Sequence, residues 1–248
     1  QQLEKVQTYQ ESCCVCCATS RALEYDMDIH LITTCSSSKA AAPGSRVFPY
    51  HNTDLSGAMA TWRALLNSES SDAKLTTAEL YRGTHWKRAL TAMSCWPETQ
   101  LWVISAGLGL RHASDPALPY EATFHAMTHA PEAVWKSLTT QPPLPERCAS
   151  IAELMSRYPG DCFVIAGSPV YISAAEKDIV TGLDALDSAQ VQLTVVTSQK
   201  YSGALLPYVA ESNAGMLSRL NANMTTLNIS HALNIINNIV GARTQLQN

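Results

Sequence analysis

Four short apolar segments, each followed by small hydroxyl-bearing residues or glycine, limit the folds open to this chain. Their length and their β-branched content predict buried strands, and stretches with helical spacing separate them. Strands that alternate with helices are typical of α/β proteins, so the sequence predicts a three-layer α/β/α sandwich around a mainly parallel sheet. The predicted strands fall within residues 29–35 (IHLITTC), 99–110 (TQLWVISAGLGL), 161–169 (DCFVIAGSP) and 191–203 (VQLTVVTSQKYSG).

The segments between the strands predict the helices and the extent of the domain. Residues 111–120 contain Asp115-Pro116 and Pro119, which predict a loop. We expect residues 1–28 to form a cysteine-rich helical extension and residues 29–248 to form a single α/β domain. Helices are predicted at residues 54–67, 76–94 with a break near Gly83, 131–140, 150–159, 172–188 and 217–240.

The composition indicates a globular protein without a bulk affinity for nucleic acid. Hydrophobic residues make up 46% of the 248 residues, enough for a large core. The formal charge is −4, so a surface that binds nucleic acid has to be a local patch. No run approaches the ~18 apolar residues of a membrane span, and the first residues lack a signal-peptide pattern. We therefore expect a soluble, cytoplasmic protein with no membrane partner.

Half of the eight cysteines lie in the segment CCVCC, residues 13–17. Two interleaved Cys-x-x-Cys pairs suit zinc or an iron–sulfur cluster. A zinc signature repeats the pair further along the chain, and this sequence does not. We favour a buried, reduced segment of a cytoplasmic protein, so the sequence assigns no metal site and no cofactor.

The carboxyl ends of the predicted strands are expected to meet at one edge of the sheet, where open α/β sheets bind ligands. The segment CSSSK offers hydroxyl groups, backbone N–H groups and one positive charge, which suit a phosphate. The alternative is a serine-rich helix cap with a solvated lysine. The residues expected to bind substrate at the strand ends are Cys35, Ser36, Ser37, Ser38, Lys39, Ser105, Gly107, Gly109, Ser168, Ser198 and Lys200, and Tyr171 is expected to help close the pocket.

Residues 115–125, DPALPYEATFH, place carboxylates, an aromatic ring and an imidazole close together. Asp115 or Glu121 is expected to hold water or to stabilise an oxocarbenium ion, and Tyr120 to stack on a base. The alternative is that Tyr120 packs in the core and Glu121 caps a helix.

Residues 81–90, YRGTHWKRAL, interleave basic with aromatic side chains. Arg82 and Trp86 belong to this cluster, and such a pattern suits a nucleic-acid backbone and splayed bases. A helix with one solvated, charged face is the alternative.

Four of these segments together resemble a family of prokaryotic domains of unknown function. CSSSK, YRGTHWKRA, WVISAGLGL and PYEATF fit its motifs C-S-x-x-K, Y-x-G-x-x-[FW]-[KR]-x-A, [IL]-S-A-x-x-G-L and P-Y-[DE]-x-T, within about residues 30–125. The family looks related to peroxide-stress DNA-binding proteins and to a domain of archaeosine-synthesis enzymes. Its layout is similar to that of the uracil-DNA glycosylase superfamily, although G-x-D-P-Y and H-P-S-P-L are missing here, which argues against uracil as the substrate.

The resemblance implies that this protein handles a base in a nucleic acid. The leading hypothesis is a DNA glycosylase that excises a modified base, with defence against phage as a plausible setting and DNA as the partner. Asp115 and Glu121 would be catalytic, and Lys39 would contact the backbone or act as an amine nucleophile. The alternatives are a non-catalytic binder of distorted DNA or RNA and a hydrolase or transferase acting on nucleotides or tRNA bases. The sequence does not determine the oligomeric state.

Overall fold

A computed structural model describes residues 27–68 and 75–246, and its centre is one six-stranded sheet with strand order β4-β3-β1-β6-β7-β8. Strand β1 lies in the middle and pairs in parallel with β3 and with β6, while β7 continues the parallel arrangement to β8. Only β4 is antiparallel to its neighbour in this sheet. The strands are β1 Ile29–Thr34, β3 Thr99–Ser105, β4 Gly109–His112, β6 Cys162–Ala166, β7 Leu193–Ser198 and β8 Val209–Ser212.

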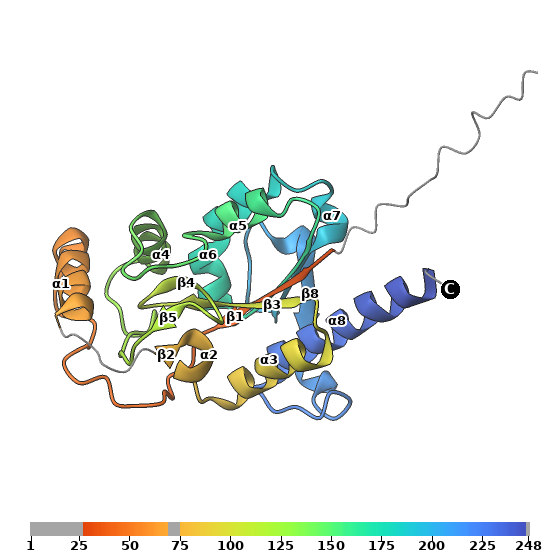
Figure 1. Ribbon diagram of the computed structural model, residues 1–248, viewed down its shortest axis with the longest axis horizontal. Coiled ribbons are helices and arrows are strands. Elements are labelled where there is room, and N and C mark those ends of the chain that lie inside the picture. The colour runs from red at the N-terminus through yellow and green to blue at the C-terminus, as the bar shows by residue number, and fades with distance from the viewer. Residues whose placement is uncertain (1–26, 69–74, 247–248) are drawn as a thin grey trace, which may run out of the picture.

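Helices cover both faces of this sheet (Figure 1). Helices α4 (Pro131–Thr140), α5 (Ile151–Arg157) and α6 (Pro169–Leu183) pack together on one face. Helices α3 (Thr84–Cys95) and α8 (Leu227–Leu246) pack on the other. The predicted α/β class with a mainly parallel sheet flanked by helices is therefore confirmed, while the likeness to uracil-DNA glycosylases stays a prediction.

The remaining elements are short or lie at the periphery. Helix α1 packs against α4, and β2 pairs with β5 in a separate antiparallel ribbon. Their bounds are α1 Leu55–Asn67, β2 Leu75–Thr76, α2 Thr77–Leu80, β5 Pro116–Ala117, α7 Ala189–Gln192 and the 3₁₀ turns Leu206–Tyr208 and Ala214–Met216.

The sheet is buried because its strands are apolar along both faces. Successive residues of a strand point to opposite faces, so a strand covered on both sides reads as a continuous apolar run. Ile29, Leu31 and Ile32 of β1 are 0% exposed. Large aromatic side chains, including those of Trp62 and Trp135, are buried as well.

Some boundaries differ from the sequence prediction, while the break near Gly83 agrees with it. Arg111 and His112 continue β4 instead of starting a loop, because the turn after β3 folds back into a hairpin at Gly109, whose φ is +80°. Residues 76–94 form two helices, and the predicted break lies at Gly83, which caps α3. The last helix begins at Leu227, since residues 217–226 form turns.

Two further predictions concern the cysteine-rich extension and membrane-spanning helices. The CCVCC segment and most of the predicted extension lie outside the described residues. Among the residues that are described, none belongs to a helix with the length and apolar character needed to cross a membrane.

Candidate functional site

A pocket of about 210 Å³ opens beside the carboxyl end of β1, and we call it the Lys39 pocket. It lies at the sheet edge where the sequence predicted a site. Its walls come from the turn after β1, from the segment after β5 and from the first turn of α6. The residues that line it are Cys35, Ser36, Ser37, Lys39, Glu121, Ala122, Thr123 and Tyr171.

The turn at residues 35–39 is held by backbone hydrogen bonds on both sides. Cys35 N–H donates to the carbonyl of Ile104 in β3, and Lys39 forms an isolated β-bridge with Tyr81. Arg82 N–H donates to the carbonyl of Ser38, so the exposed Arg82 lies next to the turn as predicted. The turn does not open a helix, and Ser36 Oγ already accepts from Ser38 N–H at 3.2 Å. The prediction that this turn opens a helix whose N–H groups bind a phosphate is therefore wrong.

Lys39 is a positioned, partly buried cation. Its Nζ donates to the carbonyl oxygens of Ser36 at 3.1 Å and Ser37 at 3.4 Å. It also lies 4.4 Å from the centroid of the Tyr120 ring, within the range of a cation–π interaction. Burial lowers the pKa of Lys39, and the nearby Cys35 and Glu121 oppose that effect. With these acceptors satisfied, the ammonium has hydrogen-bonding capacity left for a ligand.

Glu121 provides the carboxylate of the same pocket. Its backbone is fixed, because its N–H donates to the carbonyl of Arg46 and its own carbonyl accepts from Phe48 N–H. Tyr50 donates its hydroxyl proton to Glu121 Oε1 at 2.8 Å and accepts from Thr123 N–H at 3.0 Å. Burial and this bond to the carboxylate raise the pKa of Tyr50, so its hydroxyl remains a donor. One carboxylate oxygen is thus oriented by Tyr50.

Tyr120 forms the floor beneath Lys39 and is too buried to stack on a base. It is 1% exposed, and its hydroxyl lies 2.6 Å from Ser105 Oγ and 2.9 Å from the hydroxyl of Tyr81. Ser105 Oγ also accepts from the N–H groups of Gly107 and Leu108, which fixes the β3–β4 turn. The expected stacking role of Tyr120 is wrong, and the alternative that it packs in the core is confirmed.

The glycines of the turn pack against protein and do not approach a ligand. A Cβ at Gly107 would lie 2.6 Å from Tyr120 Cε2, and one at Gly109 would lie 3.3 Å from the carbonyl of Leu138. Ser105, Gly107 and Gly109 therefore shape the support of the pocket, although the sequence placed them in contact with substrate.

Tyr171 is the aromatic side chain that does line the pocket. Its hydroxyl lies 3.5 Å from Cys35 Sγ, and its ring packs 4.9 Å from that of Phe124. Tyr171 follows the turn after β6, and the sequence predicted that it would help close the pocket. Tyr50 and Thr123 were absent from the predicted site residues. Tyr50 stands in an irregular segment whose path cannot be read from spacing.

Asp115 lies outside the Lys39 pocket and has a structural role. It is 4% exposed and accepts hydrogen bonds from His112 N–H at 2.7 Å and Arg147 N–H at 3.4 Å. His112 pairs with Trp102 in the sheet, three residues before the end of β3, so this carboxylate is displaced from the carboxyl edge. Asp115 therefore does not join Lys39 and Glu121, the other predicted catalytic residues, in this pocket.

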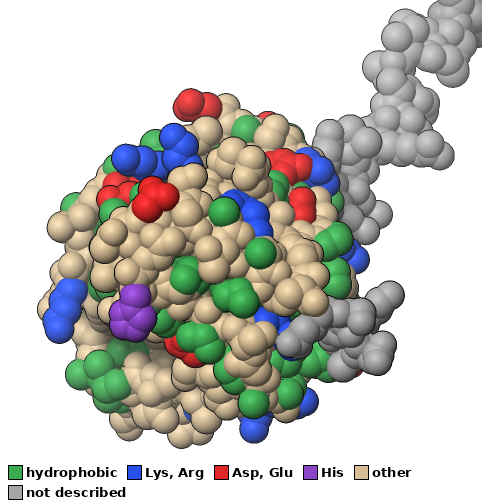
Figure 2. Space-filling model, turned by 90° about the vertical axis from the view of Figure 1, so that its left-hand side faces the viewer, with side chains coloured by type: hydrophobic (Ala, Val, Ile, Leu, Met, Phe, Trp, Pro, Cys, Tyr) green, Lys and Arg blue, Asp and Glu red, His purple; other side chains and the backbone are tan. Residues whose placement is uncertain are grey.

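The predicted basic and aromatic surface is mostly turned inward. Trp86 is 0% exposed and packs against Tyr81, while Arg88 donates to Ser230 Oγ at 2.5 Å and to the carbonyl of Asn221 at 2.6 Å. Figure 2 shows the side of the molecule toward which β1 runs, with positive side chains scattered among acidic and apolar ones. Of the described residues in the cluster, Arg82 and Lys87 are the exposed cations.

A second cavity of about 230 Å³ lies at the carboxyl ends of β1 and β6, beside the start of α8, and we call it the Asn228 chamber. Ser168 lines this chamber instead of the Lys39 pocket. Ser198 ends β7 and the exposed Lys200 follows it, and neither lines either cavity. The predicted edge exists, but the predicted site residues that the structure describes do not all line a single cleft. The chamber is lined by Thr33, Thr34, His85, Ala166, Gly167, Ser168, Met224, Thr225, Asn228 and Ile229.

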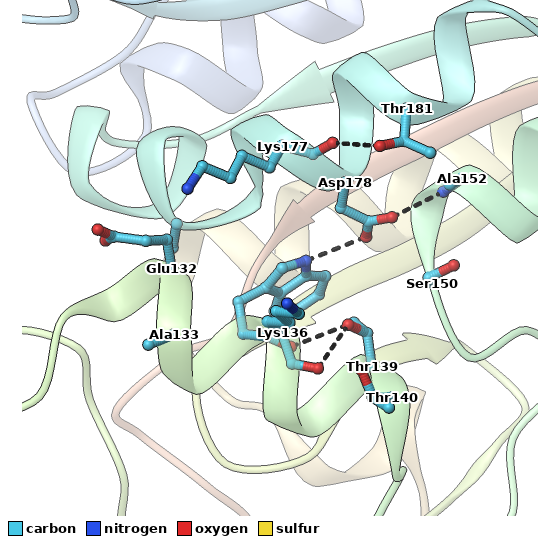
Figure 3. A pocket seen from close by; sticks show the side chains of 12 residues that line it. Glu132, Ala133, Lys136, Thr139, Thr140, Ser150, Ala152, Lys177, Asp178 and Thr181 are labelled. Carbon is cyan, nitrogen blue, oxygen red and sulfur yellow. Dashed lines mark hydrogen bonds between the residues drawn. The ribbon is translucent and has the colours of Figure 1, made fainter. Parts of the chain in front are cut away.

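A larger groove, of about 660 Å³, lies between α4, α5 and α6 (Figure 3). Its buried carboxylate, Asp178, accepts from the indole of Trp135 at 3.0 Å and from the N–H groups of Ile151 and Ala152 at 2.9 Å each. Burial raises the pKa of Asp178, and these three donors oppose that effect. The carboxylate is fully used to join α4, α5 and α6, so we do not place the chemistry in this groove.

No metal site is apparent in the part of the chain that the structure describes, since it contains no cluster of three or more suitable side chains. The chain has been compared with known proteins at the levels of family, sequence and structure. No family model, no curated protein and no solved structure matches it. The chemistry of the two cavities is therefore the guide to function.

Proposed function

We propose that this protein hydrolyses an N-glycosidic bond and holds the nucleobase of its substrate in the Lys39 pocket. One observation carries the proposal: Lys39 and Glu121, of opposite charge, line the same small pocket at the carboxyl edge of a parallel sheet. Ligands of open α/β sheets bind at this edge. The pocket also offers the ring of Tyr171 as an apolar wall for a planar base.

The two charged groups have complementary roles in this reaction. The C1′–N bond breaks and its electron pair goes to the base, where the ammonium of Lys39 stabilises the negative charge. Glu121 stabilises the positive charge that develops on the sugar and takes a proton from the attacking water. The water oxygen bonds to C1′, and the proton that Glu121 has taken from this water passes through solvent to the departing base. Tyr50 keeps the carboxylate in place for both tasks.

DNA that carries a modified base is the first candidate substrate. The motif resemblance supports it, because Cys35, Ser36, Lys39 and Glu121 belong to the matching motifs and all line the pocket. The exposed Ser37 and Arg82 beside the pocket would contact the backbone of an extruded nucleotide.

A nucleotide that is not part of a polymer is the second candidate. The inward position of Trp86 and Arg88 favours it, since a strand binder needs exposed cations and stacking rings along the strand. The formal charge of −4 agrees with this candidate.

Release of a free base is the experiment that tests the proposal. The full chain and its Glu121→Gln variant would be incubated with unmodified DNA, several phage DNAs with different base modifications, and a set of nucleotides. We expect one substrate to lose a base, detected by mass spectrometry, and the variant to be slower by about 100-fold or more. Glu132→Gln, at an exposed position of α4, is the matched control and should retain activity.

The products also separate the alternatives. An abasic product without strand scission supports hydrolysis and excludes a lyase that uses the Lys39 amine. If no substrate loses a base and the variant binds DNA as tightly as the wild type, the protein is a non-catalytic binder and the proposal is wrong.

A further inference from the structure

The Asn228 chamber contains hydroxyl groups that have no hydrogen-bond partner within the described residues. They belong to Thr33, Thr34, Ser168 and Thr225. Thr33 is 2% exposed. Buried polar groups are nearly always hydrogen-bonded in folded proteins. Of the four residues, Thr33 is buried, Thr34 and Ser168 are half-buried and Thr225 is exposed, so their hydroxyl groups are open to a ligand that enters the chamber.

The amide of Asn228 shows what kind of bond is missing. Its Nδ2 donates to the carbonyl of Gly167 at 3.0 Å, which fixes the orientation of the amide. Its Oδ1 is buried and has no partner. Because this oxygen only accepts, the group that satisfies it has to be a donor.

His85 adds a second acceptor near the same cavity. Its Nε2 lies 2.9 Å from the carbonyl oxygen of Thr34, which only accepts, so Nε2 carries the proton. Nδ1 is then an acceptor, and no described residue donates to it. Burial lowers the pKa of His85, which favours this neutral form.

The chamber is neutral, and this selects the class of ligand. No acidic side chain, lysine or arginine lines it, while Ala166 and Ile229 contribute apolar surface. An anion such as a phosphate would lack a cationic side chain there. Groups that both donate and accept, next to an apolar wall, suit a sugar with its hydroxyls and its carbon face. The volume of about 230 Å³ also exceeds the roughly 30 Å³ share of one water molecule in the liquid.

The chamber adjoins the Lys39 pocket through consecutive residues. Thr33 and Thr34 line the chamber, and Cys35 and Ser36 line the pocket. Ser168 in the chamber and Tyr171 in the pocket both belong to the start of α6. A base and the sugar attached to it are separated by one bond, so two adjoining cavities suit the two halves of one nucleoside.

We infer that the Asn228 chamber binds the hydroxyl groups of the substrate's pentose, with Asn228 Oδ1 accepting from one of them. This inference rests on the proposed function and favours its second candidate substrate. A ribose presents a 2′-hydroxyl and, in a free nucleotide, a 3′-hydroxyl. An internal residue of DNA presents neither, so the chamber selects a ribonucleotide.

Binding of two sugar probes to the full chain tests this inference. The probes are methyl β-D-ribofuranoside and its 2-deoxy analogue, measured by ligand-observed NMR titration. We expect the riboside to bind about three- to tenfold more tightly, the effect of one hydrogen bond. Thr225→Val, at an exposed position, and the isosteric Thr33→Val should each weaken the riboside by a similar factor. Asn237→Leu, at an exposed position of the same helix, is the control and should change nothing.

The outcomes separate this inference from the proposed function. Equal affinity for the two probes, or riboside binding that both valine variants leave unchanged, overturns the sugar assignment even if a base is released from DNA. Lys39→Met should leave riboside binding intact, because Lys39 does not line the chamber. Selective riboside binding without release of a base from any substrate would support the assignment of the chamber to a sugar and would contradict the proposed hydrolase activity.

Discussion

At the scale of single residues, Lys39 should make substrate affinity depend on pH. Burial lowers the pKa of Lys39 from 10.5, and the charged form is the one that contacts the base. Substrate binding should therefore weaken as the pH rises through a value below 10.5. The measurement is the dissociation constant of the substrate in Glu121→Gln protein over a range of alkaline pH. Lys39→Arg, whose guanidinium stays charged, should remove the alkaline loss. A loss that persists in Lys39→Arg would contradict the assignment.

Asp115 and Glu121 should respond to amide substitution in opposite ways. Asp115→Asn replaces a buried acceptor of two backbone N–H groups and should lower the free energy of unfolding by about 1–3 kcal/mol. Its activity per folded molecule should stay near that of the wild type. Chemical denaturation and a base-release assay measure the two effects. An Asp115→Asn protein that is stable but inactive would show that Asp115 takes part in the reaction.

Sequence reasoning identified Lys39 and Glu121 from their immediate neighbours in the chain. Lys39 is a single cation after a run of serines, and Glu121 stands in a motif. Asp115 was misplaced because a carboxylate that accepts backbone N–H groups looks the same in sequence as a catalytic one. Trp86 and Tyr120 were wrongly assigned to the binding site. An aromatic ring is found both in cores and in binding sites, and only its burial in the folded protein distinguishes the two.

At the scale of elements, the β3–β4 hairpin supports the pocket from below. Gly107 allows close contact with Tyr120, which lies under Lys39. Gly107→Ala should therefore destabilise the protein by about 1–3 kcal/mol through overpacking, and should also weaken substrate binding. Gly241→Ala is the control, since its Cβ would meet nothing within 4 Å and α8 would gain about 0.5–1 kcal/mol. Thermal denaturation of both variants measures the contrast. A neutral Gly107→Ala would show that the hairpin does not fix Tyr120.

The strands were predictable because buried parallel strands are continuous apolar runs, and the helices because their spacing repeats. The antiparallel β4 was not predicted, since Arg111 and His112 are polar residues buried in the sheet. Arg111 donates to the carbonyls of Leu144, Pro116 and Pro145, contacts that cannot be read from local sequence.

At the scale of the whole molecule, burial of His112 should make stability depend on pH. Its Nδ1 accepts from Ser114 N–H, and its Nε2 lies 3.1 Å from Gln100 Oε1, so the neutral ring is satisfied. Burial and the nearby Arg147 lower the pKa of His112 to about 4. The unfolded chain takes up this proton near its ordinary value of 6.5, so stability falls as the pH drops between these values.

The lowered pKa of His112 should change the free energy of unfolding by about 2 kcal/mol between neutral pH and pH 4, after allowance for solvent screening. His112→Gln should thus cost less stability near pH 4 than at neutral pH, as measured by denaturant unfolding at both. His51→Gln, at an exposed position, should show no such difference. A His112→Gln cost that does not change with pH would contradict the assigned protonation state.

The arrangement of the whole sheet also explains which part of the site could be foreseen. Parallel strands bring the ends of β1, β3, β6 and β7 to one edge, as the alternation of strands and helices predicted. The division of that edge into two cavities depends on the path of the turn after β1 and on the contribution of α8. Neither is encoded in local spacing, so Ser198 and Lys200 were expected in a site that they do not line.

The position of a bound nucleotide is the most direct test of the account. Crystals of the Glu121→Gln protein would be soaked with a mixture of standard and modified nucleoside monophosphates. We predict a base in the Lys39 pocket with an acceptor atom within about 3.2 Å of Lys39 Nζ, and its sugar toward the Asn228 chamber. A nucleotide bound in the groove between α4, α5 and α6, with the Lys39 pocket filled only by water, would contradict the central claim.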